Sequence, residues 1–142
     1  MALTVLDTGV VIAILDTGVV HHVPSREAVA AELRGGTALV VPASAYAEVL
    51  VAPYRRSREA AAFVDRLLAA LPATVEPATR EVARTAAELR ARHANRLRLP
   101  DALVVATAVA LGADRVLTTD ARWPALPVPV EVIGPAHSVE LD

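Results

Sequence analysis

The sequence predicts a doubly wound α/β fold with a mostly parallel central sheet of about five strands. Five short aliphatic segments alternate with longer segments of helical periodicity, which is the pattern of successive strand and helix units. Residues 99–120 show such a unit completely, because an apolar helix, a stop at Gly112 and a β-branched strand follow one another. A length of 142 residues suits one domain with a substantial core, so we expect a single domain over residues 1–142.

The predicted strands are short, and most of them are aliphatic enough to lie inside a parallel sheet. The first strand ends in Asp7, and the fourth strand is followed by Asp120 at its C-terminal end. We expect the strands at residues 3–6, 37–41, around Val75, 116–119 and 130–133.

The predicted helices begin and end at residues that commonly cap helices. Ser25 is expected to begin a helix that ends at Gly35. Ser44 is expected to cap a helix over residues 45–52, and Pro53 is expected to stop it. Further helices are expected over residues 10–15, 57–71, 79–94 and 100–111.

The composition limits the classes of function. The net charge of −2 gives no global basic field for nucleic acid, so any such contact must be local. The absence of cysteine excludes disulfides and thiolate metal sites. Hydrophobic residues make up 54% of the chain, which predicts a protein partner or a homodimer that covers apolar surface. No apolar run spans a bilayer and no signal peptide pattern begins the chain, so we expect no membrane contact and a cytoplasmic location.

Four carboxylates stand where strands end or helices begin, namely Asp7, Glu48, Asp101 and Asp120. In a parallel α/β sheet these positions share one edge. Singly, each acid has a simpler explanation as a helix cap, a partner of the helix dipole or an exposed side chain. Together, four acids at one edge repel one another unless a cation lies among them. Mg²⁺ or Mn²⁺ suits such a site, because hard cations prefer oxygen ligands.

Four motifs in order along nearly the whole chain also carry a family resemblance. They are Asp-Thr-Gly-Val at residues 7–10, Ser-x-x-x-Glu-Val-Leu at 44–50, Arg-Leu-Pro-Asp-Ala at 98–102 and Leu-Thr-Thr-Asp at 117–120. In these motifs the chain resembles the PIN domain and, more narrowly, the VapC-type toxins of bacterial type II toxin–antitoxin systems. The resemblance implies a three-layer α/β/α fold and a metal-dependent endoribonuclease that is inhibited by a cognate antitoxin.

The resemblance also implies a role for each acid. Asp7, Asp101 and Asp120 would bind Mg²⁺ or Mn²⁺ directly or through water, while Glu48 would bind metal or orient and deprotonate the attacking water. Thr118 and Thr119 are supporting candidates, since their hydroxyls can hydrogen-bond a carboxylate or a metal-bound water; strand propensity explains both threonines equally well. Candidate contacts to RNA phosphates are Arg55, Arg56 and Arg98.

Two positions depart from the family pattern. Gly9 stands where serine or asparagine is usual, which removes a hydroxyl that would support a metal-bound water. Arg122 stands where a further acid is common, which leaves the site one acid short. These departures favour an alternative, a catalytically impaired PIN-like module that only binds RNA or protein.

Two other classes of function are less well supported by the sequence. Asp-Thr-Gly occurs twice, at residues 7–9 and 16–18, which is compatible with a dimeric aspartic protease. That class needs β-rich lobes, whereas the periodicity here is mostly helical. A phosphoacceptor receiver domain would share the fold and an acidic Mg²⁺ pocket, but receivers typically depend on a lysine, and this chain has none.

Overall fold

Five parallel strands form one sheet in the order β3-β2-β1-β4-β5 in a computed structural model that describes residues 1–136. Every neighbouring pair in this sheet is parallel, where the sequence predicts a mostly parallel sheet. The end of the predicted single domain, residues 137–142, lies outside the described residues. The strands are β1 (Leu3–Leu6), β2 (Ala38–Pro42), β3 (Ala73–Glu76), β4 (Arg115–Thr118) and β5 (Val130–Val132).

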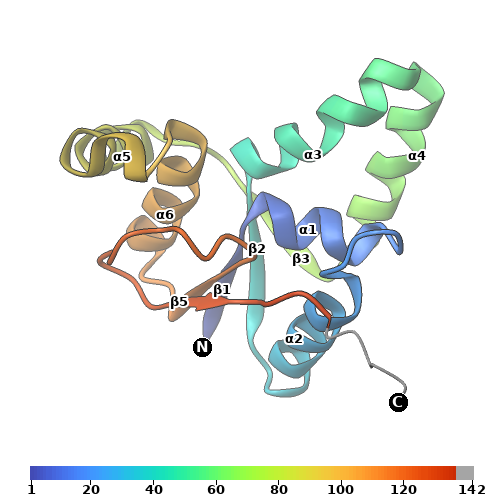
Figure 1. Cartoon of the computed structure of the whole chain (residues 1–142), viewed down its shortest axis with the longest axis horizontal. Coiled ribbons are helices and arrows are strands. Elements are labelled where there is room, and N and C mark those ends of the chain that lie inside the picture. The colour runs from blue at the N-terminus through green and yellow to red at the C-terminus, as the bar shows by residue number, and fades with distance from the viewer. Residues whose placement is uncertain (137–142) are drawn as a thin grey trace, which may run out of the picture.

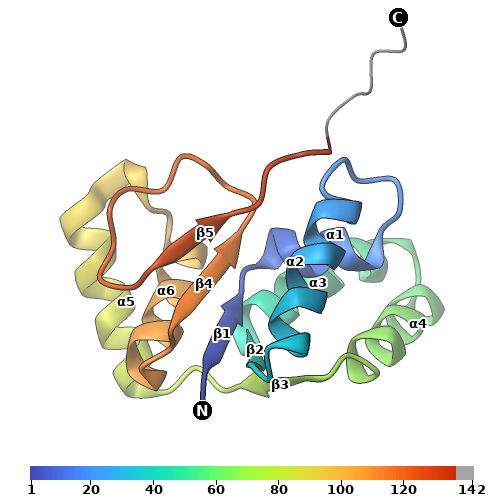
Figure 2. The same ribbon diagram turned by 90° about the horizontal axis from the view of Figure 1, so that it is seen from below.

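Helices cover both faces of the sheet and complete the predicted three layers (Figure 1). One face carries α1 (Thr8–Leu15) and α2 (His22–Arg34), and the other carries α5 (Arg80–His93) and α6 (Leu99–Leu111), joined by the short 3-10 helix η1 (Ala94–Arg96). The helices α3 (Ala43–Arg56) and α4 (Arg58–Ala69) form a hairpin that begins at the C-terminal end of β2. Figure 2 shows α5 and α6 on one side of the sheet and the α3–α4 hairpin on the opposite side of the molecule.

The core lies around the two central strands and α6. Val5 and Leu6 of β1, with Val116 and Leu117 of β4, are at most 1% exposed, because both faces of these strands are covered. Helix α6 is apolar on nearly all sides and is buried against β1, β2 and β4. Within residues 1–136, none of the helices combines the length and the apolar character needed to cross a membrane.

The start of α2 differs from the prediction. Ser25 was expected to cap this helix, but α2 begins at His22, and Ser25 is buried inside it. Pro24 explains the difference, because a proline is tolerated in the first turn, where backbone N–H groups have no helical partner. Among the described residues, the Ser25 hydroxyl has no hydrogen-bond partner.

Both predicted ends of α3 are also wrong. The N-cap is Pro42 and Ser44 lies within the first turn, while Pro53 lies inside a helix that continues to Arg56. Pro53 removes one helical hydrogen bond near the end of α3, where few further bonds depend on it. The true end is at Ser57, whose backbone N–H donates to the Pro53 carbonyl at 3.1 Å. In contrast, two predicted caps are confirmed, namely the Thr79 hydroxyl at α5 and the left-handed Gly112 at α6.

Candidate active site

The four predicted acids lie at the C-terminal edge of the sheet. Asp7 directly follows β1, and Asp120 lies two residues after the neighbouring strand β4. Asp101 is in the first turn of α6, and Glu48 is on α3. The charges of Asp101 and Glu48 both raise the pKa of Asp7, and the charge of Asp120 raises that of Asp101. The acids are therefore close enough to influence one another's protonation.

Asp7 is the most buried of these acids, with a relative exposure of 6%. Burial raises its pKa to about 6, although a hydrogen bond from Thr118 opposes the rise. Asp7 occupies the N-cap position of α1, but its side chain makes no capping hydrogen bond. Asp7 is therefore the N-cap of α1 by position and backbone only, and its carboxylate accepts a hydrogen bond from Thr118 instead of from the helix.

Thr118 connects Asp7 with Asp120. Its hydroxyl donates to Asp7 Oδ2 at 2.7 Å and accepts a hydrogen bond from the backbone N–H of Asp120 at 3.1 Å. The side chain is fully buried at the end of β4, next to the end of β1. Strand propensity alone does not account for Thr118, because its hydroxyl fixes the positions of two of the four acids relative to each other.

The charge of Arg98 acts on both Asp101 and Glu48. Burial raises the pKa of each carboxyl, and the nearby charge of Arg98 lowers both. The Trp123 indole N–H also lowers the pKa of Asp101, yet among residues 1–136 no acceptor completes a hydrogen bond to Trp123 Nε1. The sequence pattern did not assign Trp123 to the site; its only signal is its position three residues after Asp120.

Asp120 is held by Arg122. The guanidinium Nε lies 3.1 Å from Oδ1 and Nη2 lies 3.3 Å from Oδ2, and the Arg122 backbone N–H donates to Oδ1 at 2.9 Å. These hydrogen bonds lower the pKa of Asp120. The Arg122 side chain is 89% exposed, so it forms a cationic partner at the surface that is free to swing away from the carboxylate.

The oxygen donors at this edge fit a hard divalent cation, but they do not form a closed cage. Within residues 1–136, no three His, Cys, Asp or Glu side chains lie close enough to enclose an ion in their present positions. Mg²⁺ commonly takes one or two carboxylates directly and keeps several waters. The acid edge therefore suits a partly hydrated ion, whose other contacts to the acids would run through water.

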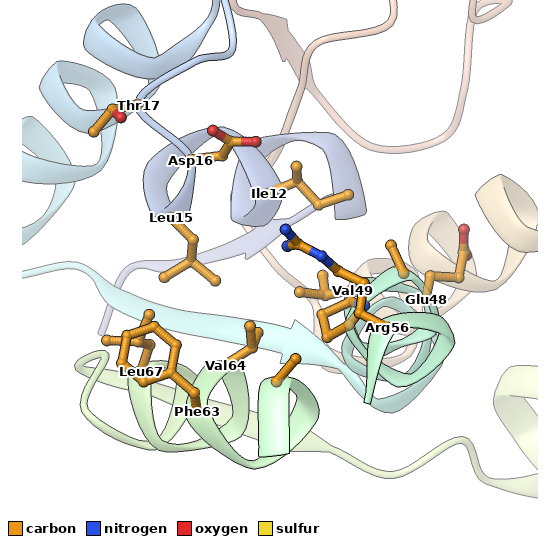
Figure 3. A pocket seen from close by; sticks show the side chains of 13 residues that line it. Ile12, Leu15, Asp16, Thr17, Glu48, Val49, Arg56, Phe63, Val64 and Leu67 are labelled. Carbon is orange, nitrogen blue, oxygen red and sulfur yellow. The ribbon is translucent and has the colours of Figure 1, made fainter. Parts of the chain in front are cut away.

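A groove of about 450 Å³ lies between α1, α3 and α4, beside the acid edge (Figure 3). Its apolar part includes Phe63, which is 56% exposed. Glu48 lies at one end of the groove, and Arg56 extends from α3 toward α1. The other apolar side chains include Ile12, Leu15, Val49, Val64 and Leu67.

The structure separates the three arginines predicted to contact RNA. Arg98 lies beside Asp101 and Glu48, and Arg56 lines the groove. Arg55 faces a different hollow, which is formed by α3 alone. Of these three arginines, Arg98 and Arg56 therefore lie near the acids, and Arg55 does not.

The second Asp-Thr-Gly copy belongs to a turn. Asp16 follows α1, and its Oδ1 accepts a hydrogen bond from the Gly18 backbone N–H at 2.9 Å. The copy is therefore a local turn motif. The parallel sheet of this chain also differs from the β-rich lobes that an aspartic protease requires.

A family model of the PIN domain matches residues 4–128. The chain belongs to the PIN domain family. No curated protein matches this PIN domain significantly by sequence.

Solved structures with the same fold come from toxin–antitoxin complexes and toxins. VapBC2 from Rickettsia felis, bound to a promoter DNA fragment, gives a TM-score of 0.73 at 13% identity, over 91% of this chain and 97% of that chain. VapBC from Salmonella typhimurium, also bound to DNA, gives 0.71 at 17% identity, over 92% and 98%. VapC20 from Mycobacterium tuberculosis, described as a Sarcin-Ricin loop cleaving toxin, gives 0.66 at 20% identity, over 80% and 86%. At these identities the likeness shows a shared fold.

Proposed function

We propose that this PIN domain is a VapC-like toxin, a Mg²⁺- or Mn²⁺-dependent endoribonuclease that hydrolyses phosphodiester bonds in RNA. The observation that carries the proposal is the buried Asp7 carboxylate, which is positioned by Thr118 at an edge that also holds Glu48, Asp101 and Asp120. Membership of the PIN family supports the proposal. The neighbouring VapBC structures and VapC20, the toxin that cleaves the Sarcin-Ricin loop, support it further.

Each of these acids has its own role in the proposed hydrolysis. Asp7, Asp101 and Asp120 would hold the ion directly or through water. An ion held there would acidify a water molecule and neutralise charge on the phosphate. Glu48 would orient the attacking water and accept its proton, a role that suits a carboxyl whose pKa is raised by burial and by Asp101. Arg98, beside Asp101 and Glu48, binds the RNA phosphate next to the cleaved bond.

RNA cleavage by the purified chain tests the nuclease function. Transfer RNA and a sarcin–ricin loop hairpin should be cut with Mn²⁺ or Mg²⁺ and remain intact in excess EDTA. Asp101→Asn should lower the cleavage rate by about 100-fold or more without unfolding the chain. Asp65→Asn, on the exposed surface of α4, is the matched control and should keep full activity. Cleavage that persists in EDTA would contradict the metal mechanism.

We propose that the cognate antitoxin places an apolar helix in the groove between α1, α3 and α4. The groove offers exposed apolar side chains, including Phe63, and it ends at Glu48, which lies among the acids. A helix with one apolar face and a basic residue at its end would match both the lining and the charge. Phe63→Asp should release toxicity in cells that co-express the antitoxin, whereas Phe63→Leu should not.

An inactive binding module is the second candidate function. The observation that favours it is the two-pronged contact of Arg122 with Asp120, which occupies a carboxylate that the nuclease needs. RNA binding without cleavage in Mn²⁺ would support this candidate. The homodimer and the cytoplasmic location stay predictions, and sedimentation of the purified chain tests the first of them.

A further inference from the structure

Gly9 and Thr119 fit together at the acid edge. Gly9 lies in the first turn of α1, two residues after Asp7, and Thr119 lies between β4 and Asp120. A Cβ atom on residue 9 would come closer than 3.0 Å to Thr119 Oγ1, a distance that real Cβ atoms essentially never show. The Thr119 hydroxyl therefore fills the space beside Gly9, and a side chain at position 9 would force this hydroxyl to turn away.

The hydroxyls of Thr118 and Thr119 have different neighbours. The Thr118 hydroxyl is already engaged, because it donates to Asp7 and accepts from the Asp120 backbone N–H. Thr119 follows directly on β4, is half-buried, and places its hydroxyl against the first turn of α1. A hydroxyl both donates and accepts a hydrogen bond, so Thr119 can connect a carboxylate with a water bound to an ion.

We propose that Thr119 is a positioning residue that orients the water shell of the ion at the acid edge, and that Gly9 is required to leave room for its hydroxyl. The hydroxyl that position 9 lacks is thus provided by the residue that follows β4. This inference rests on the proposed metal-dependent function. Under this inference Gly9 makes room for the Thr119 hydroxyl, and its presence does not indicate a catalytically impaired site.

Removal of the hydroxyl alone is the first test. Thr119→Val keeps the shape of the side chain and should weaken Mn²⁺ binding by about 10-fold or more in calorimetry, as is typical when a group behind a metal ligand is lost. Thr119→Ser restores the hydroxyl and should bind Mn²⁺ like the wild-type chain. Thr74→Val, on the exposed surface of β3, is the control for the substitution itself. Wild-type Mn²⁺ affinity in Thr119→Val would overturn the inference.

A reciprocal exchange is the second test. Gly9→Ser alone should clash with Thr119 and lower the melting temperature of the metal-free chain by about 4 °C or more. Thr119→Ala alone should weaken Mn²⁺ binding. The double variant should recover both the melting temperature and the Mn²⁺ affinity, because the serine introduced at position 9 then provides the hydroxyl. A double variant that binds Mn²⁺ no better than Thr119→Ala would overturn the inference.

The wild-type chain separates the two possible failures. If it binds no Mn²⁺, the proposed metal-dependent function fails, and the role of Thr119 fails with it. If the wild-type chain binds Mn²⁺ and Thr119→Val binds equally well, only the inference about Thr119 fails.

Discussion

Replacing Asp7 with asparagine should make the metal-free protein more stable while it abolishes metal binding. The wild-type carboxylate is 6% exposed, and burial raises its pKa from 3.8 to about 6. At about 1.4 kcal/mol for each tenfold change in proton affinity, the charged Asp7 costs the folded state about 3 kcal/mol at pH 7. Asparagine is nearly the same size and still accepts the Thr118 hydrogen bond, so Asp7→Asn should recover about 2–3 kcal/mol.

The raised pKa of Asp7 determines how the stability difference between wild type and Asp7→Asn changes with pH. Below pH 3.8 the carboxyl is protonated in both the folded and the unfolded chain, and its charge has no effect on stability. Between 3.8 and about 6 the unfolded chain loses this proton while the folded chain keeps it, so the folded state loses stability as pH rises. The stability gap between Asp7→Asn and wild type should therefore open over this range and be complete above pH 6.

Urea unfolding in EDTA at several pH values between 4 and 7 measures the gap. The exposed Asp65→Asn variant controls for the general effect of removing one acid, and it should follow wild type at every pH. Addition of Mn²⁺ should then stabilise the wild-type chain and leave Asp7→Asn unchanged. Parallel loss of stability in wild type and Asp7→Asn across this range would refute the claim that burial makes Asp7 costly.

Three further predictions concern the surroundings of the acids and the core. Arg122→Ala should tighten Mn²⁺ binding severalfold in calorimetry, because the guanidinium that competes for Asp120 is removed. Trp123→Phe keeps the ring but removes the indole N–H that lowers the pKa of Asp101, so the acidic limb of the pH–rate profile for RNA cleavage should move to higher pH. Leu97→Ala, at a fully buried position before α6, should lower the free energy of unfolding by about 2–5 kcal/mol in urea titration.

The sequence predicted the sheet well because its signals are local and strong. Strands β1 and β4 are short aliphatic runs buried on both faces, and their pattern has few alternative explanations. The helix boundaries predicted from Pro53 and Ser25 were wrong for a different reason. A proline or a serine changes the local preference by a few kcal/mol at most, and tertiary packing of the surrounding helix outweighs that preference.

The acid edge was predictable only in part. Parallel topology places residues after β1 and β4 at one edge, so the sequence order of Asp7 and Asp120 was sufficient to expect them there. The roles of Arg122 and Trp123 depend on how one loop after β4 folds back, and no periodic pattern encodes that geometry. The close fit of Gly9 with Thr119 likewise joins residues that only the folded sheet brings together.

The hydrogen bond between Thr118 and Asp7 joins residues 111 positions apart, from the fourth strand to the first. A ribosome must therefore synthesise most of the chain before Asp7 meets its partner, because β4 is inserted beside β1 only after β2 and β3 have been made. Until then the growing chain has an incomplete acid edge. The acid edge of this chain is therefore completed only late in its translation, whatever the edge binds.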